Sequence, residues 1–207
     1  MVGATVPRVK LFSGPNRSGK LALLEELGGQ FNLGVYINAD EIEKLLNRQG
    51  FLHAADYQLQ VSHAGLDEFL ASGQTAAGMQ TSEKLGLRIT ENIIVLRPEA
   101  ALDSYVAATV ADFLRHQLLA NSISFTFESV MSHRSKLDFL RLAASKGYRT
   151  YLSRTYANRL SWRAKRSNRP RTIPAPVVLV RLPRFARHDR RLLRKSYCIT
   201  SQRKRQR

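Results

Sequence analysis

The sequence predicts an α/β fold in which a mostly parallel sheet is flanked by helices, followed by an irregular, Arg-rich C-terminal tail. Two observations lead to this prediction. Short apolar runs typical of strands alternate with amphipathic helical patterns through residues 1–152, as they do in parallel sheets with crossover helices. The charge is also divided, because residues 1–150 contain 15 basic and 15 acidic side chains, and the whole net charge of +17 comes from the residues after them.

The first apolar run, residues 9–12, leads into a loop bounded by glycines. The loop reads Gly14, Pro15, Asn16, Arg17, Ser18, Gly19 and Lys20, which matches the pattern G-x-x-x-x-G-K in full, and a helical pattern follows it. In this motif, backbone N–H groups and the start of the helix surround phosphate oxygens, and the lysine adds a point charge. The order of strand, loop and helix therefore predicts a nucleotide-binding loop of the P-loop type.

Two positions depart from the usual P-loop pattern. The residue after the lysine is normally Ser or Thr, whose hydroxyl ligates Mg²⁺, but this chain has Leu21. Arg17 stands where such loops often have glycine. Two interpretations stay open: a tolerated variant of the loop, or a loop in which metal-assisted transfer is impaired.

A second strand is expected at residues 34–37, with a helix from about residue 41 to residue 48. Asp40 lies between them, at the carboxyl end of the strand, where open α/β sheets place their ligands. A carboxylate at that position can accept the proton of an attacking hydroxyl. The alternative interpretation is that Asp40 only caps the following helix.

The middle of the chain, about residues 50–96, is interpreted as a helical insertion that closes over the substrate side. An amphipathic helix is expected around residues 105–119, and residues 124–127 predict a third strand. Glu128 directly follows that strand, on the side where ligands are expected. A helix with its apolar side at residues 137–144 and a strand from residue 148 to residue 152 complete the predicted sheet.

Three segments, taken together and in order, resemble the zeta-toxin-like P-loop kinases. They are the loop at 14–20, the segment YINADEI at 36–42 and the segment FTFESVMSH at 125–133, within a resemblance that covers about residues 7–152. The resemblance implies a P-loop NTPase-like domain that transfers a phosphoryl group from ATP to a small-molecule hydroxyl, such as one on UDP-N-acetylglucosamine. It implies that Lys20 and Asp40 are catalytic and that Glu128 binds substrate. The resemblance also implies that Mg²⁺ is a cofactor, although Leu21 lacks the hydroxyl that would ligate it. It further implies that an antitoxin protein could be a partner.

The resemblance ends after residue 152. Residues 153–207 contain four of the seven prolines and one acid, Asp189, among clusters of arginine, and only residues 177–180 look like a strand. Three hypotheses stay open: a disordered arm that binds nucleic acid through its arginines, a solvated extension without a role, and the product of a shifted reading frame. The hypothesis of a shifted reading frame is favoured, because the acidic residues and the resemblance to the family end together within a few residues. It predicts little kinase activity, since the cationic lid that stabilises the transferring phosphoryl group would be missing.

The composition argues against a disulfide-bonded, membrane-spanning or secreted protein. The single cysteine, Cys198, excludes an internal disulfide bond and fits a reducing compartment. No apolar stretch approaches the roughly 20 residues that span a bilayer. Residues 1–10 lack the long apolar run of a secretory signal. A cytoplasmic protein without a membrane segment is therefore expected.

Overall fold

The apolar runs and helical patterns of the sequence form alternating strands and helices. The structure is a computed structural model, and it describes residues 6–14, 28, 32–73, 78–130, 135–154 and 178–181. The chain divides into two compact units, one formed by Leu33–Glu128 and the other by Met1–Asn32 with Ser129–Arg207. Parallel strand pairs occur in both units, and helices accompany them. The predicted α/β class, with a mostly parallel sheet flanked by helices, is confirmed.

In the unit Leu33–Glu128, β2 (Val35–Ile37) pairs in parallel with β6 (Phe125–Ser129), whose last residue belongs to the other unit. The register places Val35 opposite Phe125 and Ile37 opposite Phe127, and all four of these side chains are buried. Both strands lie where the sequence predicts them. Their apolar positions alternate with polar ones because successive side chains point to opposite faces of a sheet.

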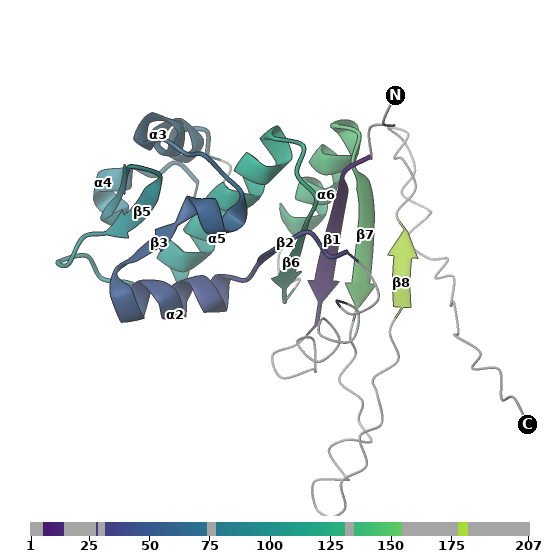
Figure 1. Ribbon diagram of the computed structural model, residues 1–207, viewed down its shortest axis with the longest axis horizontal. Helices are drawn as coiled ribbons and strands as arrows, with labels where there is room; N and C mark the ends of the chain where they lie inside the picture. The colour runs from purple at the N-terminus through teal and green to yellow at the C-terminus, as the bar shows by residue number, and fades with distance from the viewer. Residues whose placement is uncertain are drawn as a thin grey trace, which may run out of the picture. The chain divides into compact units, whose positions relative to one another are not determined.

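Two helices of this unit, α2 (Ala39–Gln49) and α5 (Ser104–Ala120), pack against each other, and α5 also contacts β2 (Figure 1). In α2, Ile42 and Leu46 lie four residues apart and are fully buried, which is the spacing of one helix face. The first turn of α5 is capped by Asp103, whose carboxylate accepts hydrogen bonds from two backbone N–H groups. Both helices extend one or two residues beyond their predicted ends.

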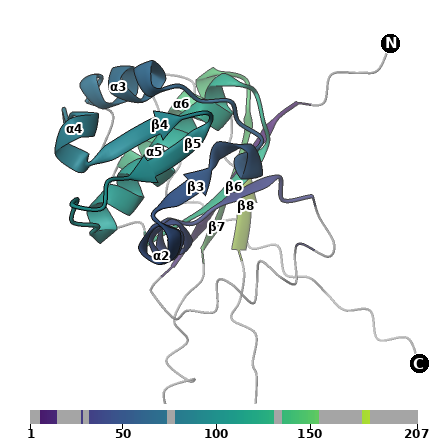
Figure 2. The same cartoon turned by 60° about the vertical axis from the view of Figure 1, so that its left-hand side comes forward.

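The segment predicted to be a helical insertion contains strands as well as helices, so that prediction is corrected here. It consists of β3 (Phe51–His53), the 3₁₀ helix η1 (Ala54–Tyr57), α3 (His63–Ala71), α4 (Ser82–Leu85), β4 (Leu87–Thr90) and β5 (Ile93–Leu96). The three strands form an antiparallel sheet in the order β3-β5-β4 (Figure 2). Residues 93–96 form its central strand because their mostly β-branched side chains favour extended backbone over helix. Glu91 and Asn92, both with positive φ, form the two-residue turn between β4 and β5.

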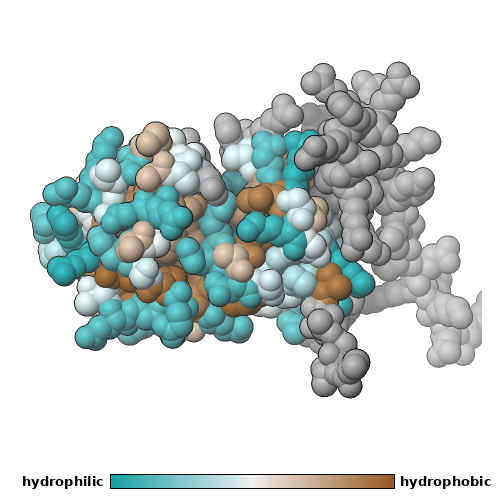
Figure 3. Space-filling view, turned by 90° about the horizontal axis from the view of Figure 1, so that it is seen from above, coloured by the Kyte–Doolittle hydropathy of each residue, from teal (hydrophilic) through white to brown (hydrophobic). Residues whose placement is uncertain are grey.

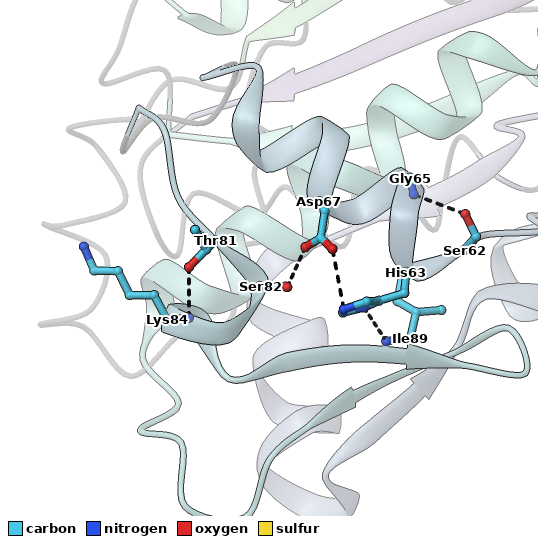
Figure 4. Close-up of polar contacts among 8 residues, drawn as sticks. All are labelled: Ser62, His63, Gly65, Asp67, Thr81, Ser82, Lys84 and Ile89. Carbon is cyan, nitrogen blue, oxygen red and sulfur yellow. Dashed lines mark hydrogen bonds and ion pairs between the residues drawn. The ribbon is translucent and has the colours of Figure 1, made fainter.

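Polar contacts join the elements of this segment (Figure 4). The side chain of Ser82, at the start of α4, donates a hydrogen bond of 2.5 Å to Oδ1 of Asp67 on α3. His63 lies one turn before Asp67, with its Nε2 3.6 Å from Oδ2 of that carboxylate, and its Nδ1 accepts a hydrogen bond from the backbone N–H of Ile89 on β4. Ser62 caps α3 by accepting from the backbone N–H of Gly65. These contacts connect both short helices and the edge strand of the small sheet.

In the other unit, β1 (Arg8–Ser13) pairs in parallel with β7 (Arg149–Arg154), and α6 (Ser135–Ser145) contacts β7. All three elements lie where the sequence predicts them. The tail contributes one described strand, β8 (Val178–Arg181), which pairs antiparallel with β7 and confirms the strand predicted at 177–180 (Figure 1). The rest of the predicted arm after Arg154 lies outside the described residues.

Polar side chains cover most of the visible face of the described residues, with apolar ones in smaller groups among them (Figure 3). Among the helices of the described part of the chain, none combines the length and the hydropathy that crossing a bilayer requires.

Candidate functional site

The structure describes Gly14, the first residue of the predicted phosphate loop. Strand β1 ends at the buried Ser13, and the backbone N–H of Gly14 donates a hydrogen bond of 3.3 Å to the carbonyl oxygen of Ser129, the last residue of β6. Gly14 therefore begins its loop at the carboxyl end of a parallel strand, as the motif requires. The rest of the loop, residues 15–20 with Lys20, and the following Leu21 lie outside the described residues. Their roles stay predictions.

Glu128 accepts a hydrogen bond from Tyr36 on β2, and Asn38 in turn donates to Tyr36. The phenolic O–H of Tyr36 donates a hydrogen bond of 2.6 Å to Oε1 of Glu128, and Nδ2 of Asn38 donates one of 3.0 Å to the same phenolic oxygen. All three side chains are half-buried. The strand register explains this meeting: Tyr36 lies opposite Thr126, and Glu128 is two residues further on the same face of the sheet.

Asn38, and not Asp40, caps helix α2. The side-chain oxygen of Asn38 accepts a hydrogen bond of 2.9 Å from the backbone N–H of Asp40, while Asn38 itself has extended backbone angles. The interpretation that Asp40 caps the helix is therefore wrong. Asp40 and Glu41 lie in the first turn of α2, where the helix dipole favours negative charge, and both side chains are exposed. The Asp40 carboxylate is thus accessible at the carboxyl end of β2.

The pKa values of two tyrosines, Tyr36 and Tyr57, are raised in this unit. Burial raises the pKa of Tyr36 far above its usual value, and its hydrogen bond to Glu128 adds to this rise. The pKa of Tyr57, in η1, is also raised, first by burial and then by the negative charge of Glu41. Both phenols therefore keep their protons at neutral pH. The carboxyl end of β2 therefore combines the acids Asp40, Glu41 and Glu128 with the Tyr36 phenol and the Asn38 amide.

A buried ion pair supports the strand that carries Glu128. Asp112 and Arg115, one turn apart on α5, form an ion pair with exposures of only 8% and 5%. The Arg115 guanidinium also lies 4.6 Å from the ring centre of Phe127, the residue before Glu128. Burial lowers the pKa of Arg115 to about 9, which still leaves it charged at neutral pH. The Asp112 carboxylate and the Phe127 ring offset the cost of burying this cation.

A separate cleft of about 570 Å³ lies between α4, the residues after β5 and the start of α5. Its lining has mixed charge, with Lys84 and Arg97 among the acids Glu83, Glu99 and Asp103. Its described lining includes neither Asp40 nor Glu128. Within the described ranges, no three or more His, Cys, Asp or Glu side chains are grouped so that they could hold a metal ion.

Sequence reasoning identified the two acids Asp40 and Glu128 but not the side chains that connect them. From the sequence, Tyr36 is expected in the strand at 34–37 and Asn38 directly after it, and neither is expected to contact an acid. A usable signal was present, because Tyr36 and Asn38 are two residues apart and so share one face of an extended segment. Tyr57 gave no signal of this kind, since its place near Glu41 depends on the fold of residues 50–96.

No protein-family model, curated protein sequence or solved structure matches this chain. The resemblance to the zeta-toxin-like kinases thus depends on the three sequence segments alone.

Proposed function

We propose that this chain is a nucleotide-binding protein of P-loop NTPase type that acts as a zeta-toxin-like kinase, with ATP as phosphoryl donor and a small-molecule hydroxyl, such as one on UDP-N-acetylglucosamine, as acceptor. One observation carries the proposal. Asp40 and Glu128 lie at the carboxyl ends of two strands that pair in parallel, and Asn38 and Tyr36 join the backbone N–H of Asp40 to the Glu128 carboxylate through hydrogen bonds. This is the edge of an α/β sheet at which ligands bind.

Each residue has a distinct task in this reaction. Lys20 and the amides of the loop bind the phosphates of ATP. The acceptor oxygen attacks the γ-phosphorus, the bond from that phosphorus to the ADP oxygen breaks, and Asp40 takes the proton of the acceptor hydroxyl. Glu128 accepts a hydrogen bond from an acceptor hydroxyl and orients it for attack.

The residues present fit Mg²⁺ poorly. Leu21 provides no oxygen at the position that normally ligates the metal. No step above is therefore routed through a metal ion. We expect ATP to bind with little dependence on Mg²⁺ and turnover to be slow.

Isothermal titration with ATP, with and without Mg²⁺, tests nucleotide binding. Lys20→Ala should weaken ATP binding about tenfold or more, because a charge-assisted contact to phosphate is lost. Lys146→Ala, at an exposed lysine after α6, is the matched control and should bind as the wild type does. Absence of ATP binding by the wild-type protein would contradict the proposal.

Phosphorus NMR of the protein incubated with ATP and UDP-N-acetylglucosamine tests the transfer itself. A phosphorylated sugar nucleotide should form slowly and should disappear with Asp40→Asn, which cannot accept the proton. Rapid, Mg²⁺-dependent transfer would support the kinase function. It would overturn the interpretation that Leu21 impairs metal-assisted phosphoryl transfer.

The charge distribution favours a second candidate function, nucleic-acid binding through the tail, because the whole net charge of +17 lies after residue 150. Truncation after Arg181 is the sharpest test, since it removes ten basic residues and keeps β8 paired with β7. Binding of the full chain to DNA or RNA should fall on the order of a thousandfold between low and physiological salt. The truncated chain should lose most of this affinity and of its salt dependence. Equal binding by both chains would exclude the tail as the binding element.

A further inference from the structure

A continuous chain of hydrogen bonds connects the two acids of the proposed site. It runs from the backbone N–H of Asp40 to Oδ1 of Asn38, from Nδ2 of Asn38 to the Tyr36 hydroxyl, and from that hydroxyl to Oε1 of Glu128. The distances along it are 2.9, 3.0 and 2.6 Å. The chain crosses from the start of α2 to β6, which are far apart in the sequence.

Each member of this chain has its direction fixed by the next. The side-chain oxygen of Asn38 accepts from the backbone N–H of Asp40, and its NH₂ group donates to the Tyr36 hydroxyl. Flipping the amide by 180° would break both hydrogen bonds. A phenol has one proton, and Tyr36 directs it toward Glu128 because the amide of Asn38 donates to the phenolic oxygen. Fixing one carboxylate oxygen of Glu128 sets the plane of the group and therefore the direction of its second oxygen.

We infer that Tyr36 and Asn38 are positioning residues that hold the Glu128 carboxylate in one orientation relative to Asp40 and thereby set the affinity for the acceptor. This inference rests on the proposed kinase function, in which Glu128 orients the acceptor hydroxyl. Without the hydrogen bond from Tyr36, the Glu128 side chain has fewer restraints, and more of its ordering has to accompany acceptor binding. Ordering a flexible side chain weakens binding about three- to tenfold.

Titration calorimetry with two separate probes, UDP-N-acetylglucosamine and ATP, tests the inference. Tyr36→Phe removes only the hydroxyl and should weaken binding of the sugar nucleotide about three- to tenfold, while ATP binding stays within about twofold of the wild type. Asn38→Ser keeps a good helix cap but cannot reach the phenol, so it should produce the same selective loss. Tyr105→Phe, at an exposed tyrosine of α5, is the control and should change neither affinity.

A double-mutant cycle shows whether Tyr36 acts through Glu128. In the Glu128→Ala background, Tyr36→Phe should cause less than about a twofold further loss of sugar-nucleotide affinity, because the group to be positioned is gone. The positioning role is overturned if Tyr36→Phe leaves that affinity unchanged, if its effect is the same in both backgrounds, or if ATP affinity and melting temperature fall with it as in a purely structural defect.

The same titrations separate failure of this inference from failure of the proposed function. A wild-type protein that binds both probes, with unchanged affinity in Tyr36→Phe, rejects only the positioning role. Binding of ATP without binding of the sugar nucleotide rejects the acceptor assignment and the positioning role together, and leaves nucleotide binding intact. A wild-type protein that binds neither probe rejects the proposed function and, with it, this inference.

Discussion

Gly34 and Ser124 approach each other so closely that a Cβ atom on Gly34 would overlap the carbonyl group of Ser124. Gly34 also has a φ angle of +71°, a region that side chains disfavour. Directly after it, the backbone N–H of Val35 donates a hydrogen bond of 3.0 Å to the carbonyl oxygen of Ser124, at the start of the β2–β6 pairing. This contact sets the register that brings Tyr36 to Glu128.

Gly34→Ala should therefore lower the free energy of unfolding by about 3 kcal/mol or more, since backbone strain and overlap with backbone atoms add together. Gly50→Ala is the matched control, because Gly50 has a φ of +77° but open space where the Cβ would lie. That variant should lose only about 1 kcal/mol. Urea unfolding of both variants measures the difference, and equal losses would show that the approach to Ser124 is not limiting.

The buried pair Asp112–Arg115 should be far more sensitive to losing one partner than to losing both. Arg115→Met leaves the Asp112 carboxylate buried without its cation and should cost about 3–5 kcal/mol of unfolding free energy. Adding Asp112→Leu should recover a large part of that loss, because an apolar pair replaces a buried charge. Chemical denaturation of the two variants measures this, and a double variant less stable than Arg115→Met would contradict it.

Because the Tyr148 phenol is buried, we expect the free energy of unfolding to fall at alkaline pH. The residue is 4% exposed, and burial raises the pKa of its phenol from 10 to about 12. Below pH 10 the phenol is protonated in both states, whereas between pH 10 and pH 12 the unfolded state releases the proton and the folded state keeps it. The wild type should therefore lose about 1 kcal/mol relative to Tyr148→Phe on going from pH 8 to pH 11. Denaturation curves at both pH values measure this difference, and a constant difference would refute the prediction.

The hypothesis of a shifted reading frame makes a prediction about the gene. Translating the other two frames downstream of codon 152 should give, in one of them, a sequence with acids and the Gly-Gly-His-Asp lid pattern that the resemblance implies. Neither frame giving such a sequence would reject the hypothesis and leave the basic arm and the solvated extension as the remaining explanations.

Much of the fold could be predicted because its signals are local. Strands β1, β2, β6 and β7 and helices α2, α5 and α6 lie where apolar periodicity places them, since the spacing of apolar residues decides which backbone buries them on one face. The prediction for residues 50–96 is wrong because their apolar positions fit both a helix and a strand over a few residues. Pairing of β5 with strands on both sides decided that ambiguity.

The candidate site was predicted only in part for the same reason. The positions of Asp40 and Glu128 follow from their places at strand ends, but the partner of Glu128 is Tyr36, which lies 92 residues away in the chain. No local pattern specifies such a contact, because it depends on the register of β2 against β6.

The sequence by itself determined the order of strands and helices outside residues 50–96, the division between a neutral region and a basic tail, and the two acids at strand ends. These properties depend on residue type and on spacing over a few positions. The tertiary structure alone decided that Tyr36 contacts Glu128 and that Arg115 is buried against Phe127. Those contacts form only when distant segments pack together, since the energy of each pair depends on a geometry that no short stretch of chain contains.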